Sequence, residues 1–151
     1  MKMLPKNLQT CLVLSSLVGC ISLAPLQSHA HGGLGHMQVT AWAVENLEQG
    51  ELRAFLAHPD VFNSILFGAA YPDIGYYPGL LYPDIARQFA EYSHWPTFTE
   101  SFIQWIREND PPPWTSVESR KRIAFLMGCA AHGFQDEVFD TLFLDQVGHH
   151  D

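Results

Sequence analysis

Residues 128–140 read GCAAHGFQDEVFD, which places a histidine and two aspartates at intervals of four residues. On an α-helix of 3.6 residues per turn, side chains four positions apart emerge along one face, so His132, Asp136 and Asp140 are expected to form one stripe. Imidazole and carboxylate groups are zinc ligands, and the stripe is therefore a candidate metal-binding face. The same spacing also occurs on solvated helices, where carboxylates simply face water. The motif alone leaves both interpretations open.

The first half of the chain predicts further helices. Apolar residues recur at steps of three and four from about His36 to Gln49, and shorter helical patterns follow over 51–56 and from Pro59. The preceding glycine-rich residues 31–35 are expected to form a flexible lead. Residues 68–79, rich in glycine, proline and tyrosine, are expected to form an ordered loop that contains Asp73. A local turn or cap role for that aspartate competes with a metal-binding role.

The second half predicts two more helices. Thr97 with Glu100 and Thr115 with Glu118 match capping boxes, in which side chains bond the first free N–H groups of a helix. The first pair predicts a helix that must end before the prolines of 111–113. The second pair predicts a long helix over about 116–146 that carries the motif. The expected fold class is all-α.

Residues 1–30 are interpreted as a secretory signal peptide. Lys2 and Lys6 supply a positive start, residues 11–25 are mainly apolar, and small residues lead to a cleavage site after Ala30. The chain is therefore expected to be exported, with one small domain over residues 31–151. A rival interpretation is a lipoprotein signal at 17–20, which would anchor the protein through a lipid on Cys20. Cleavage after Ala30 is favoured because so short an apolar segment is a processed signal and not a membrane span.

Charge and cysteine content narrow the function classes. The chain has eight basic and sixteen acidic residues, and the predicted leader contains two of the basic and none of the acidic ones. So acidic a domain argues against a nucleic-acid surface built from basic side chains, and no nucleic-acid partner is expected. Bound divalent metals would still allow a phosphate substrate, because they reverse the local field. Only Cys129 follows the leader, so it is expected to be a small packed residue.

Candidate zinc ligands are distributed along the whole exported part of the chain. They share nitrogen or oxygen donors that zinc prefers, and each lies near a predicted loop end or on the predicted long helix. They are His31, His36, Asp73, His94, His132, Asp136 and Asp140.

The order and spacing of several segments resemble the zinc-dependent phospholipase C superfamily, and most closely its branch of glycosylphosphatidylinositol-specific phospholipase D. The similar segments are Gly35-His36, Gly68 to Asp73, Ser93-His94-Trp95, Phe102 to Trp114, and Ala124 to Gly128 leading to His132-x-x-x-Asp136. The resemblance implies an all-α domain around a cluster of on the order of two or three zinc ions.

The resemblance also implies roles for individual residues. Asp73, His94, His132 and Asp136 are similar to one zinc site, with Asp136 able to bridge to a neighbouring metal that His36 binds. Cleavage after Ala30 would make His31 the amino terminus, which binds metal in bacterial members of the superfamily.

Two features of the sequence depart from the family pattern. Asp140 stands where the family usually has a histidine, although aspartate is also a zinc ligand. The chain ends at Asp151 before the region that supplies the family's remaining ligands, so the sequence is expected to be incomplete at its C-terminus.

The implied activity is hydrolysis of phospholipid or glycosylphosphatidylinositol-type phosphodiesters by metal-activated water, with transient contact to a membrane surface. Asp73 is the expected catalytic residue, as a zinc ligand that also orients the water. Tyr71, Tyr76, Tyr77 and Trp95 are candidates for a lipid entrance, although packing around the loop competes with that role. Two alternatives remain open: a single-strand nuclease of the related zinc superfamily, and a non-catalytic metal-binding domain associated with membranes.

Overall fold

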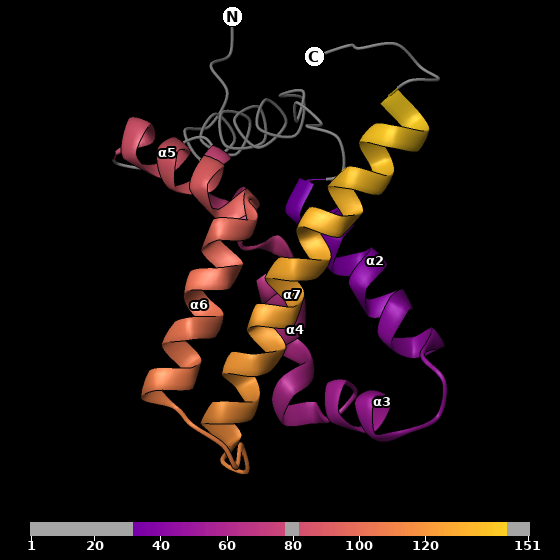
Figure 1. The fold of residues 1–151 in the computed structure, drawn as a ribbon. Coiled ribbons are helices and arrows are strands. Elements are labelled where there is room, and N and C mark those ends of the chain that lie inside the picture. The colour runs from indigo at the N-terminus through magenta and orange to yellow at the C-terminus, as the bar shows by residue number, and fades with distance from the viewer. Residues whose placement is uncertain (1–31, 78–81, 145–151) are drawn as a thin grey trace, which may run out of the picture.

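The computed structural model describes residues 32–77 and 82–144, and within them it is all-α, as predicted (Figure 1). The predicted leader, His31 and the C-terminal residues 145–151 lie outside the described residues. The α-helices are α2 Gly32–Asn46, α3 Glu51–Leu56, α4 Pro59–Ala70, α5 Pro83–His94, α6 Pro96–Asn109 and α7 Val117–Phe139. A 3₁₀ turn, η1 (Pro72–Tyr76), follows α4, and a π-helical turn, η2 (Asp140–Leu144), continues α7.

Helix α7 is the central element, with α6 on one side and α2 on the other (Figure 1). Its most extensive contact is with α4. Two glycines allow these helices to touch through their backbones. A Cβ atom on Gly68 would overlap the carbonyl of Phe125, and one on Gly128 would overlap the carbonyl of Ile65. The glycines therefore set the short distance between α4 and α7.

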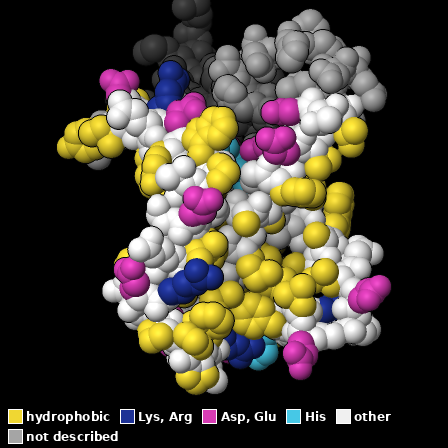
Figure 2. All heavy atoms as spheres, in the orientation of Figure 1, with side chains coloured by type: hydrophobic (Ala, Val, Ile, Leu, Met, Phe, Trp, Pro, Cys, Tyr) yellow, Lys and Arg dark blue, Asp and Glu magenta, His cyan; other side chains and the backbone are white. Residues whose placement is uncertain are grey.

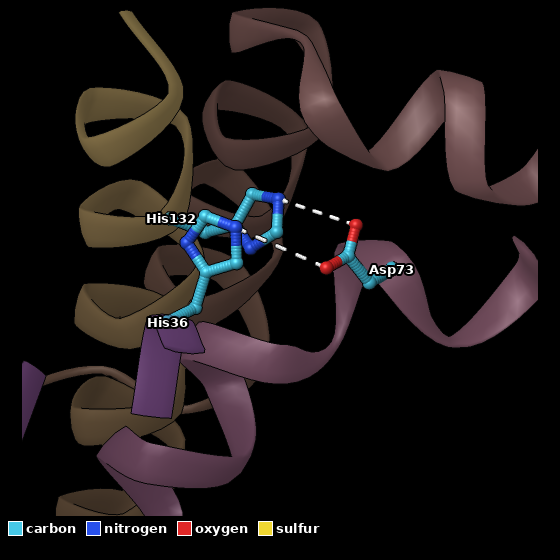
Figure 3. Close-up of side chains that lie close together, drawn as sticks. All are labelled: His36, Asp73 and His132. Carbon is cyan, nitrogen blue, oxygen red and sulfur yellow. Dashed lines mark ion pairs between the residues drawn. The ribbon is translucent and has the colours of Figure 1, made fainter. Parts of the chain in front are cut away.

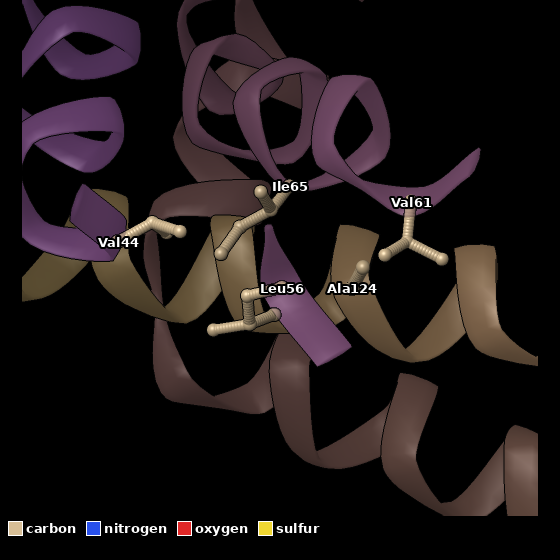
Figure 4. Packing of buried hydrophobic residues seen from close by; sticks show 5 residues of the cluster. All are labelled: Val44, Leu56, Val61, Ile65 and Ala124. Atoms are coloured by element: carbon tan, nitrogen blue, oxygen red, sulfur yellow. The ribbon is translucent and has the colours of Figure 1, made fainter. Parts of the chain in front are cut away.

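The hydrophobic core lies between α2, α3, α4 and α7. Val44 of α2, Leu56 of α3, Val61 and Ile65 of α4 and Ala124 of α7 are all buried and pack together (Figure 4). Burying a side chain such as Val, Leu or Ile stabilises a fold by roughly 1.5–3 kcal/mol relative to exposure. The core thus fixes four helices against one another.

The start of α7 is held by a polar network. Ser116 caps the helix by accepting a hydrogen bond from the backbone N–H of Ser119. Asp110, after the end of α6, accepts from the Ser119 hydroxyl at 2.7 Å and from Arg122 at 2.9 Å. The predicted cap at Thr115 was therefore wrong by one residue, while the predicted helix start near Ser116 is confirmed.

Three other expectations need correction. The glycine-rich lead is helical, because α2 begins at Gly32 and not near His36. The capping box at Thr97 does not form: Trp95 is the N-cap of α6, and no side chain bonds the first N–H groups there. Helix α5, Pro83–His94, was not predicted at all. It packs mainly on η1, and none of its residues belongs to the main core cluster.

The surface has apolar regions beside its charged ones. A groove of about 470 Å³ lies between α4, α6 and α7, and Phe67, Phe102 and Phe125 line it together with Lys121 and Arg122. Figure 2 shows hydrophobic side chains gathered over the lower half of this face, with basic side chains beside them. Among the described helices, none combines the length and the apolar character needed to span a bilayer.

Candidate metal centre

Five of the predicted ligands come together from four elements. His36 lies on α2, Asp73 in η1, His94 at the end of α5, and His132 with Asp136 on α7. Figure 3 shows that Asp73 faces both His36 and His132. Residues almost a hundred positions apart in the chain thus converge on one small volume.

The imidazole Nε2 atoms point at the two carboxylates. Asp136 lies 3.1 Å from His132 Nε2 through Oδ2 and 3.2 Å from His36 Nε2 through Oδ1. Asp73 Oδ1 lies 3.4 Å from His94 Nε2 and 3.8 Å from His132 Nε2, and its Oδ2 lies 3.9 Å from His36 Nε2. The three rings also contact one another, since His36 stacks on His132 with centroids 3.8 Å apart and His94 meets His132 edge-on at 4.7 Å.

Each imidazole also makes a hydrogen bond through its Nδ1 atom, on the side of the ring away from the carboxylates. His132 Nδ1 lies 2.7 Å from the carbonyl oxygen of Ala69, and His94 Nδ1 lies 2.7 Å from that of Ala90. A carbonyl oxygen only accepts, so both Nδ1 atoms carry the proton and donate. In a neutral imidazole this leaves the Nε2 lone pair directed at the carboxylates. Metal-binding histidines characteristically show this arrangement, with the outer N–H given to a carbonyl or carboxylate.

His132 gives the strongest sign that a cation belongs here. Its side chain is fully buried, and within residues 32–77 and 82–144 its Nε2 atom has no hydrogen-bond partner although Asp136 lies close by. A buried polar atom without a partner costs free energy, typically about 1–3 kcal/mol. A lone pair that faces a carboxylate oxygen is repelled by it unless a proton or a metal ion lies between them.

The surroundings shift two pKa values in directions that bear on metal binding. Burial alone would raise the pKa of Asp136, but the contacts with His132 and His36 outweigh it and hold that pKa well below its usual value. Burial would lower the pKa of His94, but Asp73, the Ala90 carbonyl and the charge of Asp136 outweigh it and raise that pKa. Asp136 is therefore ionised, while a proton competes for His94.

The distances fit zinc. Zinc bonds to nitrogen and oxygen ligands at about 2.0–2.2 Å, so two ligands of a tetrahedral ion lie roughly 3.3 Å apart. The contacts of 3.1, 3.2 and 3.4 Å match that separation. The donor set of imidazole nitrogens and carboxylate oxygens is also the one that zinc takes in catalytic sites.

The donor atoms form two overlapping sets. His36, Asp73 and His132 make one, and His94, His132 and Asp136 make the other, with all ligand atoms of each set within 4.8 Å of one another. A single imidazole lone pair binds only one ion, so His132 cannot serve both sets at once. The two carboxylates each have two oxygens and are the groups suited to connect neighbouring ions.

The centre is open on one side. His36 and His132 have side chains 3% and 0% exposed, whereas that of Asp136 is 34% exposed. His94 and Asp73 are intermediate. Solvent can therefore reach the centre at Asp136, while the histidines of α2 and α7 are buried beneath it.

Two predicted ligands are not brought into these sets. Asp140 is exposed at the start of η2, one turn beyond Asp136, and belongs to neither group of ligand atoms. His31 lies outside the described residues. Their roles as ligands remain predictions.

Several residues that support the centre were missed by the sequence analysis. Gln135 links His36 to Thr40 by two hydrogen bonds. His36 Nδ1 lies 3.1 Å from Gln135 Oε1, and Gln135 Nε2 donates to Thr40 Oγ1 at 2.9 Å. Ala69 and Ala90 contribute only backbone carbonyls, which no sequence pattern reveals. For Gln135 alone the sequence offered an indication of a supporting role, because it precedes Asp136 and follows His132 by one helical turn.

The candidate entrance residues divide into two groups. Tyr71 packs against Phe89, Phe98 and Phe125, so packing is its role. Tyr76 lies beside the ring of His94 with centroids 5.5 Å apart, and Trp95, the next residue, is 61% exposed. An entrance near His94 therefore remains a prediction.

Cys129 is buried, as predicted, and is not a ligand of these sets. Burial raises the pKa of its thiol to about 12, so it stays protonated at neutral pH. Zinc binds the thiolate, and a protonated thiol on this buried face acts as a small packed group.

The family model described as zinc dependent phospholipase C matches residues 35–139, which include all five side chains of the centre. The chain belongs to the zinc-dependent phospholipase C family. No solved structure matches it.

The curated relatives include a named enzyme of this family. The chain is 28% identical to human phosphatidylinositol-glycan-specific phospholipase D over 84% of its own length, and 30% identical to the mouse enzyme over 89%. It spans only 14% and 16% of those two proteins. The branch predicted from the sequence is thus confirmed, and the match concerns one part of much longer relatives.

Proposed function

We propose that the protein is a zinc-dependent phosphodiesterase that hydrolyses phospholipid or glycosylphosphatidylinositol-type substrates with metal-activated water. The single observation that carries this proposal is the convergence of three Nε2 atoms, held by outer hydrogen bonds, on the carboxylates of Asp73 and Asp136. Family membership supports phospholipase chemistry, and the donor set supports zinc. We expect the complete protein to hold on the order of two or three ions.

Five side chains would hold the metal: His36, Asp73, His94, His132 and Asp136. Zinc held there would lower the pKa of a bound water from about 15.7 towards 7 and would so supply the nucleophile for attack on phosphorus. In their neutral forms with the proton on Nδ1, His36, His94 and His132 would present the Nε2 lone pair to the metal. Asp136 is ionised at neutral pH, since the contacts with His132 and His36 hold its pKa well below the usual value.

Asp73 is proposed as the catalytic carboxylate. It enters from η1, opposite the two residues of α7, and both of its oxygens face imidazoles at 3.4–3.9 Å. A carboxylate at this position can accept a proton from attacking water while one oxygen remains available to metal.

The proposed substrate is an amphiphile, so the protein must meet a lipid surface, at least transiently. Export would bring it to such surfaces outside the cell, by the predicted cleavage after Ala30 or, alternatively, by lipidation at Cys20. Trp95, exposed directly beside His94, is the proposed contact. Tryptophan suits a membrane interface because its ring is apolar and its N–H is polar.

The experiment incubates the chain with vesicles of phosphatidylcholine or phosphatidylinositol, with a glycosylphosphatidylinositol-anchored protein, and with single-stranded DNA. Phosphorus NMR of the products identifies the bond broken. Zinc-dependent cleavage of a lipid substrate, abolished by chelator and by Asp73→Asn, is expected. Cleavage of DNA alone would favour the nuclease alternative, and zinc loading without any cleavage would favour a non-catalytic metal-binding domain.

A further inference from the structure

His36 differs from the other two histidines of the centre in what holds its outer nitrogen. Ala69 and Ala90 hold His132 and His94 through backbone carbonyls, which accept only. His36 Nδ1 instead lies 3.1 Å from a side-chain atom, the amide oxygen of Gln135. An amide side chain can present either an acceptor or a donor, so its orientation decides which proton His36 carries.

The orientation of Gln135 has its own support. Its Nε2 donates to the Thr40 hydroxyl oxygen at 2.9 Å, an arrangement in which the amide oxygen faces His36. Thr40 is 2% exposed and lies one turn after His36 on α2, while Gln135 comes from α7. The bonds therefore tie the two helices together behind the metal centre.

The tautomer matters because only one form of His36 can bind metal through Nε2. With the proton on Nδ1, the Nε2 lone pair faces Asp136 Oδ1 at 3.2 Å and Asp73 Oδ2 at 3.9 Å. With the proton on Nε2, the ring would bond to Asp136 and would have no lone pair on that side. Both forms are close in energy in an isolated imidazole, so an outer acceptor selects between them.

We propose that Gln135, backed by Thr40, is a positioning residue that holds His36 in the Nδ1–H tautomer and thereby sets the zinc affinity of the α2 side of the centre. This inference rests on the proposed function, because it requires that the centre bind zinc. No direct contact between Gln135 and the metal or the substrate is involved.

The test compares variants of Gln135 that differ only in hydrogen bonding. Gln135→Met keeps the length of the side chain and removes the acceptor, so zinc affinity measured by chelator competition should fall about 10–100-fold. Gln135→Glu restores an acceptor for Nδ1–H and should bring the affinity back to within a few-fold of the wild type. Gln38→Met, an exposed position on the same helix as His36, is the matched control and should leave it unchanged.

A spectroscopic readout separates positioning from a merely structural role. Long-range proton–nitrogen NMR of the metal-free protein should show a larger share of the His36 proton on Nδ1 in the wild type and in Gln135→Glu than in Gln135→Met. In Gln135→Met it should move towards Nε2, while the protons of His94 and His132 stay on Nδ1, where backbone carbonyls accept them. Thr40→Val should shift the same equilibrium in the same direction.

Equal zinc affinity and an unchanged tautomer in Gln135→Met would overturn the inference while leaving the proposed function intact. A failure of Gln135→Glu to recover affinity would also overturn it, because steric packing would then explain the loss. A wild-type chain that binds no zinc would overturn both proposals.

Discussion

The Nδ1 atom of His132 lies 2.7 Å from the backbone carbonyl oxygen of Ala69. Ala69 is one of the last four residues of α4, whose carbonyls have no partner inside the helix. The metal centre is thus bonded directly to the helix pair whose close contact depends on Gly68 and Gly128. The orientation of His132 therefore depends on how α4 packs against α7.

Gly128→Ala should therefore damage both stability and metal binding. The added methyl group meets backbone atoms of Ile65 and Ala69, which cannot turn away as a side chain can. Overpacking of this kind costs about 1–3 kcal/mol, and zinc affinity should fall with it. The control is Gly50→Ala, where a Cβ meets nothing. Denaturant titration and chelator competition measure the two effects; a Gly128→Ala protein as stable as the control would refute the close-packing explanation.

Asp136→Asn should lower zinc affinity more than the same substitution at a carboxylate outside the centre. Asp136 touches two imidazoles, and an amide in its place has one oxygen and no charge. We expect affinity to fall at least about 100-fold, at or beyond the upper end of the effect of losing an outer partner. Asp84→Asn, exposed in the first turn of α5, is the matched control. Equal losses from both would mean that the ligands are assigned wrongly.

Zinc affinity should fall as the pH is lowered, and the fall should begin above pH 6.5. Zinc binds the neutral imidazole, and the raised pKa of His94 means that a proton occupies it at a higher pH than in an ordinary histidine, for which the pKa is about 6.5. The low pKa of Asp136 adds no competing proton in this range. Calorimetric titration from pH 8 to pH 6 in buffers of different ionisation enthalpy would measure affinity and proton release. A constant affinity without proton release would contradict this role of His94.

Trp95→Ser should reduce activity on vesicles and spare activity on a soluble short-chain phospholipid. Trp95 is 61% exposed beside His94, so its loss should weaken contact with the lipid surface and leave the chemistry intact. Trp42→Ser is a matched control, since Trp42 is 57% exposed and lies on α2, whereas His94 lies on α5. Equal effects of the two changes on vesicle activity would exclude a specific contact at Trp95.

The sequence predicted those parts of the molecule that depend on local pattern. Helices α3, α4 and α7 follow from apolar periodicity, from Pro59 at a first turn and from the breaks at Gly50 and 111–113. The residues of the centre followed from their spacing together with the family resemblance. His132 and Asp136 share a helix face, so their proximity was predictable from periodicity alone.

What could not be predicted depends on tertiary contacts. The glycines of residues 32–35 are poor helix formers, yet α2 includes them; Gly33 is buried there against Ala70 and Tyr77. The carbonyls behind His94 and His132 leave no trace in the sequence, because every residue has one. Asp140 lies outside both sets of ligand atoms, and its role as a ligand remains a prediction.

X-ray absorption at the zinc edge tests the central claim most directly. The wild-type chain loaded with zinc should show only nitrogen and oxygen neighbours at about 2.0–2.2 Å, with the scattering of several imidazoles and no sulfur at about 2.3 Å. The zinc signal should be lost after dialysis of Asp136→Asn and retained by Asp84→Asn. A wild-type chain that retains no zinc, or zinc bound through the sulfur of Cys129, would contradict the metal centre described above.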